Sequence, residues 1–178
     1  ATPSTINVID QVNPVSTGNA TDFGDLIAAR QYMGGMGNKI KGIYGGGDGA
    51  SNVIQNTANF ASGGNCSDFG NLTNSRLGLT AVGNDTRIIF AGGDNAPSYK
   101  NEIDQVSFAT TGNATDFGDL QAGESFVGGV SSTTRGVITG GNAGGDAPAA
   151  TGPEATTHLI TLTTLGNATD FGEMNTAK

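Results

Sequence analysis

Apolar residues along the chain come in short runs that alternate with polar residues and end at Gly, Asn, Asp or Thr. Alternation of this kind predicts short strands joined by tight turns. In the last third of the chain it predicts strands near residues 126–130, 136–139 and 158–162, and a weaker strand around Phe171. No window of ten or more residues has helical periodicity. The sequence therefore predicts an all-β protein.

A ten-residue motif repeats along the chain. The letters TGNATDFGDL occupy residues 17–26 and return unchanged at residues 111–120, and near-copies stand at 63–72 (GGNCSDFGNL) and 165–174 (LGNATDFGEM). The motif phenylalanines are spaced 46, 48 and 54 residues apart: Phe23, Phe69, Phe117 and Phe171. Repetition at intervals of about 50 residues indicates a structural unit used several times.

Other features follow the same period. A cation (Lys41, Arg87 or Arg135) opens an apolar run in each full unit, and a Gly-Gly pair ends it: Gly46 and Gly47, Gly92 and Gly93, Gly140 and Gly141. The chain thus forms one repeat domain, with half a unit at 1–26, full units at 27–72, 73–120 and 121–174, and the start of another at 175–178.

Periods near 50 residues with several short strands are typical of β-propeller blades. About three and a half units leave open how the ring closes: by an abbreviated blade, by strands from a neighbouring chain, or as part of a longer chain. A two-sheet sandwich is the alternative fold, and the regular period argues against it.

The repeats resemble the kelch repeat, in which a strand ends in Gly-Gly, a second strand follows, and an aromatic residue closes the blade before the next Arg. Here Phe stands where that family usually has Trp, and the usual Tyr between the two is not clearly present. Residues 103–120 and 134–141 resemble, more narrowly, kelch-like repeats in virion proteins of tailed phages that infect marine cyanobacteria and related bacteria. This resemblance implies kelch-like propeller blades in a tail-fibre, appendage or capsid-decoration protein.

Within the motif, each residue type has an expected structural role. Gly112 and Gly118 can adopt positive φ, and Asn113 and Asp116 can bond nearby backbone N–H groups in Asx-type turns. Phe117 is expected to lie buried between neighbouring blades, as are the other three motif phenylalanines. The Gly-Gly pairs are expected to let backbones approach closely.

Charge excludes one class of partner. The formal net charge is −8, and the eight Lys and Arg residues do not cluster. A nucleic-acid surface needs a basic stripe, so none is expected. No apolar run is long enough to predict membrane insertion.

The residues that usually carry chemistry are sparse. Cys66 is the single cysteine and stands where other copies have Ala, and His158 is the single histidine and occupies the position of Asp10 and Asp104. A catalytic or metal-binding His needs partners, so we expect no enzyme, no metal and no cofactor.

The motif aspartates are expected to be turn carboxylates rather than Ca²⁺ ligands, and the arginines to bond carboxylates or carbonyls. Asn-x-Ser/Thr sequences at motif positions could instead carry glycans: Asn19, Asn65, Asn113 and Asn167.

The candidate partner-binding surface lies in loops whose length varies between units. The third unit carries the longest loop, at 142–157, which holds Asp146 and Glu154, and the second unit offers Tyr99 and Lys100. Loops on a rigid scaffold often carry recognition, and Tyr is a good anchor.

The leading functional expectation is a non-enzymatic structural and binding module at a virion surface or otherwise outside the cell. Its expected partners are other virion proteins, further copies of itself, and a cell-surface glycan or protein receptor. Alternatives are a cellular extracellular adhesin, a kelch-like interaction adaptor, and a glycosylated filament subunit.

Overall fold

The computed structural model describes residues 5–48, 51–57, 59–143, 152–153 and 155–176, and every regular element in these residues is a β-strand. This confirms the all-β prediction. Within the same residues, no helix has the length and apolar character that crossing a membrane requires.

The strands form one two-stranded hairpin followed by three four-stranded antiparallel sheets. The N-terminal hairpin is β1 (Val8–Gln11) and β2 (Thr21–Asp25). The first sheet is β3 (Gly34–Gly37), β4 (Gly42–Gly45), β5 (Val53–Asn56) and β6 (Ser67–Asn71). The second is β7 (Thr80–Gly83), β8 (Arg87–Ala91), β11 (Glu102–Ser107) and β12 (Thr115–Asp119). The third is β14 (Gly128–Ser131), β15 (Arg135–Thr139), β18 (Thr156–Thr161) and β19 (Thr169–Glu173).

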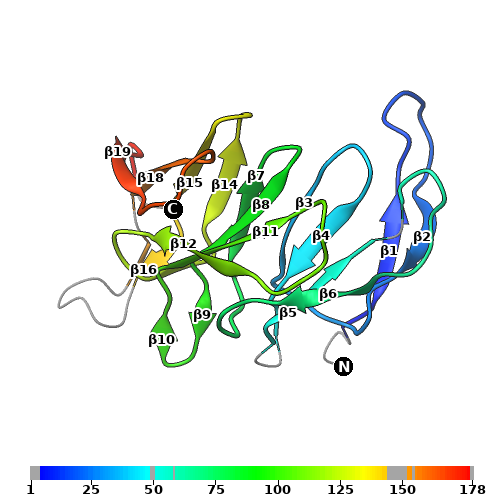
Figure 1. Cartoon of the computed structure of the whole chain (residues 1–178), viewed down its shortest axis with the longest axis horizontal. Helices are drawn as coiled ribbons and strands as arrows, with labels where there is room; N and C mark the ends of the chain where they lie inside the picture. Colours follow the sequence, from blue (N-terminus) through cyan, green and yellow to red (C-terminus); the bar gives the residue numbers. More distant parts are fainter. Residues whose placement is uncertain (1–4, 49–50, 58, 144–151, 154, 177–178) are drawn as a thin grey trace.

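Each sheet lies within one of the units defined by the sequence period, and its strands pair in chain order. Figure 1 shows the sheets side by side along the molecule, with the N-terminal hairpin in blue at one end of the long axis and β19 in red at the other. Two small sheets were not predicted: β9 (Asp94–Asn95) with β10 (Ser98–Tyr99), and β13 (Glu124–Ser125) with β16 (Asn142–Ala143) and β17 (Gly152–Pro153).

The first strands of the sheets pack against one another, with β7 contacting both β3 and β14. Glycine makes this approach possible. A Cβ added to Gly34 would lie 3.1 Å from the backbone of Thr80, and one added to Gly129 would lie 2.7 Å from the side chain of Val82. The high glycine content therefore serves close packing of neighbouring sheets.

The motif phenylalanine is the extra residue of a β-bulge. In the second sheet Ile103 pairs with Gly118 and Asp104 pairs with Asp116, so Phe117 has no partner across the strands. The same shift occurs in the N-terminal hairpin and in the other two sheets. Gly118 follows with φ +149°, a backbone conformation that side chains rarely adopt. The bulge thus turns the ring out of the strand ladder.

Each motif also binds the preceding one through its backbone. The N–H of Gly112 donates to the carbonyl of Phe69 (2.8 Å), and the N–H of Ala114 donates to the carbonyl of Asn71 (2.8 Å). The side-chain Oδ1 of Asn113 accepts from the N–H of Asn71 (3.1 Å). We call this set the motif contact.

The motif contact recurs at both other boundaries between units. Gly64 and Gly166 donate to the carbonyls of Phe23 and Phe117, and Cys66 and Ala168 donate to the carbonyls of Asp25 and Asp119. Asn65 and Asn167 accept from the N–H groups of Asp25 and Asp119. The expectation that the motif Asn bonds nearby backbone was wrong for these residues, because its partner lies in the previous unit. The motif Asp does bond locally: Gly118 N–H donates to Asp116 Oδ1 (3.0 Å).

Apolar side chains fill the spaces between sheets. Phe69 and Leu72 of the first sheet share a core with Val106 and Phe108 of the second. One boundary later, Phe117 and Leu120 share a core with residues of the third sheet that occupy the same positions, Ile160 and Leu162. The core is thus a series of layers between successive sheets rather than one central cluster.

Three motif phenylalanines are buried as expected, and one is not. Phe23, Phe69 and Phe117 are 8%, 3% and 3% exposed, but Phe171 is 57% exposed. The prediction was wrong for Phe171 because, among the described residues, no further sheet packs over the bulge of β19.

The Gly-Gly pairs have left-handed backbones throughout: φ is +73° and +105° at Gly46 and Gly47, +65° and +112° at Gly92 and Gly93, and +67° and +93° at Gly140 and Gly141. The second glycine of a pair also bonds the next unit, since Gly47 N–H donates to the carbonyl of Arg76 (3.0 Å) and Gly93 N–H to that of Glu124 (2.7 Å). Close backbone approach is therefore observed at these positions.

A glycine substitution tests the motif contact. A Cβ added to Gly118 would lie 2.4 Å from the carbonyl oxygen of Gly166, whereas one added to Gly166 would have nothing within 4 Å. The two residues have nearly equal φ, +149° and +151°. We expect Gly118→Ala to destabilise the protein by about 2–4 kcal/mol and Gly166→Ala by about half as much, because only the first adds a steric clash to the backbone strain. Urea unfolding of both variants measures the difference, and equal losses would contradict the motif contact.

Candidate functional site

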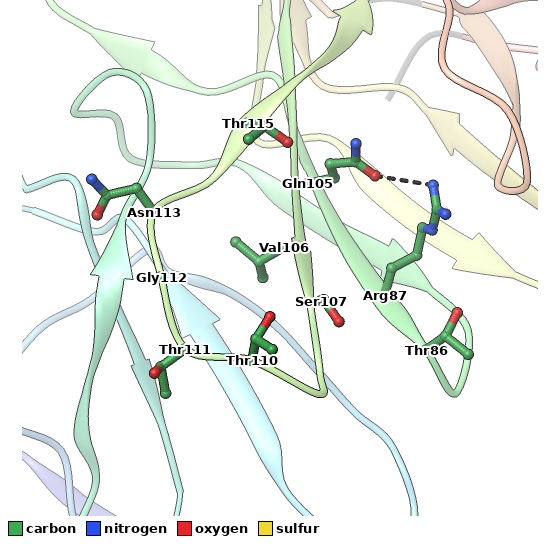
Figure 2. Close-up of a pocket in the computed structure, with 10 residues that line it drawn as sticks. All are labelled: Thr86, Arg87, Gln105, Val106, Ser107, Thr110, Thr111, Gly112, Asn113 and Thr115. Atoms are coloured by element: carbon green, nitrogen blue, oxygen red, sulfur yellow. Dashed lines mark hydrogen bonds between the residues drawn. The ribbon is translucent and has the colours of Figure 1, made fainter.

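The described residues form an open pocket beside the hairpin of β11 and β12. It has a volume of about 380 Å³ and is lined by three segments: the start of β8, strand β11, and the loop that leads into β12 (Figure 2). The lining residues are Thr86, Arg87, Gln105, Val106, Ser107, Thr110, Thr111, Gly112, Asn113 and Thr115.

Hydroxyl and amide groups dominate this pocket. Arg87 and Gln105 lie side by side, and the guanidinium Nη1 donates to Gln105 Oε1 at 3.0 Å (Figure 2). Both side chains are half-buried. A guanidinium has five donors, so Arg87 keeps others for a ligand, and each hydroxyl can both donate and accept. The arrangement suits a ligand rich in hydroxyl or carboxylate oxygen.

A second pocket of about 440 Å³ has the same construction in the N-terminal hairpin. Gln11, Ser16, Asn19 and Thr21 line it where Gln105, Thr110, Asn113 and Thr115 line the first, 94 residues later in each case. In the described residues this hairpin pairs with no strand equivalent to β8, so its pocket has no counterpart of Arg87. The motif repeat therefore makes the hairpin pocket, and Arg87 distinguishes the copy in the second sheet.

The predicted partner-binding residues lie elsewhere or outside the described chain. Tyr99 and Lys100 are half-buried at the end of the β9–β10 hairpin and do not line the pocket. Their backbone joins two units, since Lys100 N–H donates to the carbonyl of Gly93 (2.7 Å) and the Lys100 carbonyl accepts from Glu124 N–H (3.1 Å). Asp146 and Glu154 lie outside the described residues.

Two buried pairs of polar side chains occupy equivalent positions in successive units. In the second full unit Arg76 Nη2 lies 3.1 Å from Asp104 Oδ2 of β11, and in the third Glu124 Oε1 lies 3.0 Å from His158 Nε2 of β18. All four side chains are almost fully buried. Burial lowers the pKa of Arg76, and Asp104 opposes that shift. The expectation that an arginine bonds a carboxylate is confirmed for Arg76, and the only histidine pairs with Glu124 inside the protein.

Cys66 lies partly buried in the motif contact. Desolvation raises the pKa of its thiol from 9.0 to about 11. At pH 8 the thiolate population in the folded chain is therefore about 100-fold lower than in the unfolded chain, and reactivity follows the thiolate. We expect iodoacetamide to alkylate native Cys66 about 100-fold more slowly than the urea-unfolded chain, as measured by mass spectrometry. Equal rates would show that the thiol is not desolvated.

The same shift has a consequence for stability. Because the unfolded thiol ionises near pH 9 and the folded one near 11, this group's contribution is present below pH 9 and is lost as pH rises toward 11. Cys66→Ala removes this loss and should otherwise be tolerated, since Ala114 and Ala168 occupy the same position in the other units.

An exposed aromatic pair was not predicted. The rings of Tyr32 and Phe126 meet edge to face with centroids 5.6 Å apart, and both residues have positive φ, +62° and +57°. They stand nine residues after Phe23 and Phe117, the motif phenylalanines of the preceding units, and the same position in the second full unit is Gly78 at φ +66°. The glycine at this repeat position was the signal in the sequence for a left-handed backbone.

No group of three His, Cys, Asp or Glu side chains that could hold a metal ion occurs in the described part of the chain. A scan against protein-family models finds none that matches this chain. A search of curated proteins likewise finds no match.

Proposed function

We propose that this chain is a non-enzymatic structural and binding module of a virion surface, built from kelch-like β-propeller blades. Two kinds of observation support the proposal. The four-stranded antiparallel sheets follow one another in chain order with their first strands in contact, as blades do around a propeller axis. Residues 103–120 and 134–141 resemble repeats of virion proteins, which supports the location.

The observation that carries the proposal is the use of the repeated motif. Its Gly, Asn and small residue bind the preceding unit, and its Phe fills the next layer of core. The repeated motif therefore joins neighbouring sheets, and this is a structural role. The only histidine is buried in the same scaffold, paired with Glu124.

The binding part of the proposal assigns recognition to the hydroxyl-rich pocket of Figure 2. Its donors and acceptors fit a hydroxylated, carboxylate-bearing glycan, with Arg87 as the partner of the carboxylate. The matched control is Arg135, which opens β15 as Arg87 opens β8 but is exposed.

The location is tested on particles. Gradient-purified phage and uninfected host cells are compared by peptide mass spectrometry, and antibodies against the chain are used for immunogold labelling. We expect the peptides and the label on particles. Peptides in uninfected cells instead would favour the alternative, an extracellular adhesin or interaction adaptor.

Recognition is tested by competition. Purified chain should reduce phage adsorption to host cells, and Arg87→Ala should weaken this competition by about tenfold or more, as the loss of a charge-assisted hydrogen bond does. Arg135→Ala should leave it unchanged. If Arg87→Ala competes fully and Tyr99→Ala does not, the loop surface is the recognition site and the pocket is not.

A further inference from the structure

Another pocket adjoins the hydroxyl-rich pocket at Thr86. It has a volume of about 490 Å³ and lies where the turn between β7 and β8 meets the turn between β14 and β15, so we call it the turn pocket. Thr86 lines both pockets, and Figure 2 shows it beside Arg87 at the edge of the first. The second full unit supplies most of the lining of both pockets and has a described unit on each side.

Hydrogen bonds between units hold the turn pocket in shape. Asn84 Nδ2 donates to the carbonyl of Thr133 (2.9 Å). The hydroxyl of Ser131 donates to the carbonyl of Gly83 (2.8 Å), and its oxygen accepts from the N–H of the same glycine (3.1 Å). The two turns are thus fixed to each other within the chain itself. A site that is already formed loses less free energy to ordering when a ligand binds.

The two pockets differ in charge. The hydroxyl-rich pocket carries Arg87, whereas the turn pocket carries Asp85 and the thioether of Met36. Lys39 Nζ lies 3.9 Å from Asp85 Oδ2, but both side chains are mostly exposed to solvent, so this pair neutralises little of the carboxylate charge. One pocket therefore attracts a carboxylate and the other repels it.

We propose that the two pockets together bind one acidic oligosaccharide, with a carboxylate-bearing sugar at Arg87 and an uncharged sugar in the turn pocket. This inference rests on the proposed function and adds three things to it: the length of the glycan, its direction along the surface, and Asp85 as the residue that selects it. Each pocket alone has the size of a small-molecule site, about 300–1,000 Å³, so a ligand that fills both has at least two linked sugars.

The side chains between and within the pockets suit such a ligand. The Thr86 hydroxyl donates to Asn84 Oδ1 (2.7 Å), which leaves its oxygen free to accept from a sugar hydroxyl where the two pockets meet. In the turn pocket, Asp85 accepts from the hydroxyls of an uncharged sugar, and Met36 offers an apolar surface to its C–H groups. The sulfur of Met36 is held against Gly83, where an added Cβ would lie 3.0 Å from it.

Asp85 gives the site its selectivity. A second carboxylate, on the sugar in the turn pocket, would face the carboxylate of Asp85, and like charges placed together disfavour a wrong partner. The site therefore favours a chain with one acidic sugar over a chain in which every sugar is acidic.

Calorimetric titration of the 178-residue chain with four matched probes tests this inference. The probes are glucuronic acid, cellobiose, the disaccharide glucuronosyl-glucose with one carboxylate, and the disaccharide of two glucuronic acids with two. We expect glucuronosyl-glucose to bind about tenfold more tightly than each of the other three, because only this probe matches both pockets.

Asp85→Asn identifies the selecting residue. In this variant the two-carboxylate disaccharide should bind within about twofold of glucuronosyl-glucose, while binding of glucuronic acid stays unchanged. Asp22→Asn is the matched control, since Asp22 is exposed in β2 and lines neither pocket, and it should keep the selectivity of the parent chain.

The outcomes separate this inference from the proposed function. If no acidic probe binds, or if Arg87→Ala binds them as well as the parent chain, the hydroxyl-rich pocket is not the recognition site and both proposals fail. If glucuronic acid binds through Arg87 but glucuronosyl-glucose binds no more tightly, the proposed function stands and the two-pocket site is wrong. Unchanged selectivity in Asp85→Asn would likewise overturn the role of Asp85.

Discussion

Phe117→Ala is expected to lower the free energy of unfolding by about 3–5 kcal/mol, the usual effect of removing a buried ring from a core. Phe117 is 3% exposed and packs in the layer that joins the second and third sheets. Its bulge leaves little freedom for the surroundings to collapse, because the backbone on both sides is fixed by the motif contact. Urea unfolding followed by far-UV circular dichroism measures the loss.

Phe171→Ala is the matched control, since it removes the same ring from the same bulge in the third sheet. At a concentration where the chain is monomeric, the variant should lose less than about 1 kcal/mol, because an exposed ring contributes little burial. Equal losses in the two variants would show that the motif phenylalanine acts within its own sheet and does not join sheets.

The second large effect is expected at the buried pair of Arg76 and Asp104. Asp104→Ala leaves the guanidinium buried without its carboxylate, which typically costs about 3–5 kcal/mol. Arg76 already has two nitrogens, Nε and Nη1, without a hydrogen-bond partner in the structure. The carboxylate also accepts from the backbone N–H and hydroxyl of Thr73 (3.1 and 2.8 Å), so these bonds are lost too.

A double variant that copies the other buried pair of the chain should restore part of the stability that Asp104→Ala loses. The third full unit holds Glu124 and His158 at the positions of Arg76 and Asp104. The double variant Arg76→Glu with Asp104→His should recover more than half of the stability that Asp104→Ala loses. If the double variant is less stable than Asp104→Ala, the two pairs are not interchangeable and the surroundings decide which one fits.

The sequence predicted the features of the fold that depend on local spacing. Alternating runs predicted strands near β14, β15 and β18, and the Gly-Gly pairs predicted close backbone approach, because strand periodicity and positive φ are properties of a few adjacent residues. The unit boundaries followed from the phenylalanine spacing for the same reason.

What the sequence could not predict depends on residues far apart. Asn113 was expected to bond its own turn, but its partner Asn71 lies 42 residues earlier, in another sheet. The burial of Phe171 was wrongly predicted because burial depends on what packs over a strand, and the four motifs look alike in sequence. The pocket beside Arg87 needs a hairpin and a neighbouring strand to come together, so no local pattern in the sequence predicted it.

The carboxylate stands on opposite sides of the two buried pairs, at Asp104 in one and at Glu124 in the other, and this has a consequence for folding. A chain with near-identical repeats can exchange strands between units and trap itself in a misfolded topology. If β18 replaced β11 in the second sheet, Arg76 would face His158 and no carboxylate, and Glu124 would be left to face Asp104, two acids in one buried site. Both mismatches are costly in a dry interior. The opposite placement of the carboxylate in the two pairs thus disfavours exchange of strands between these units.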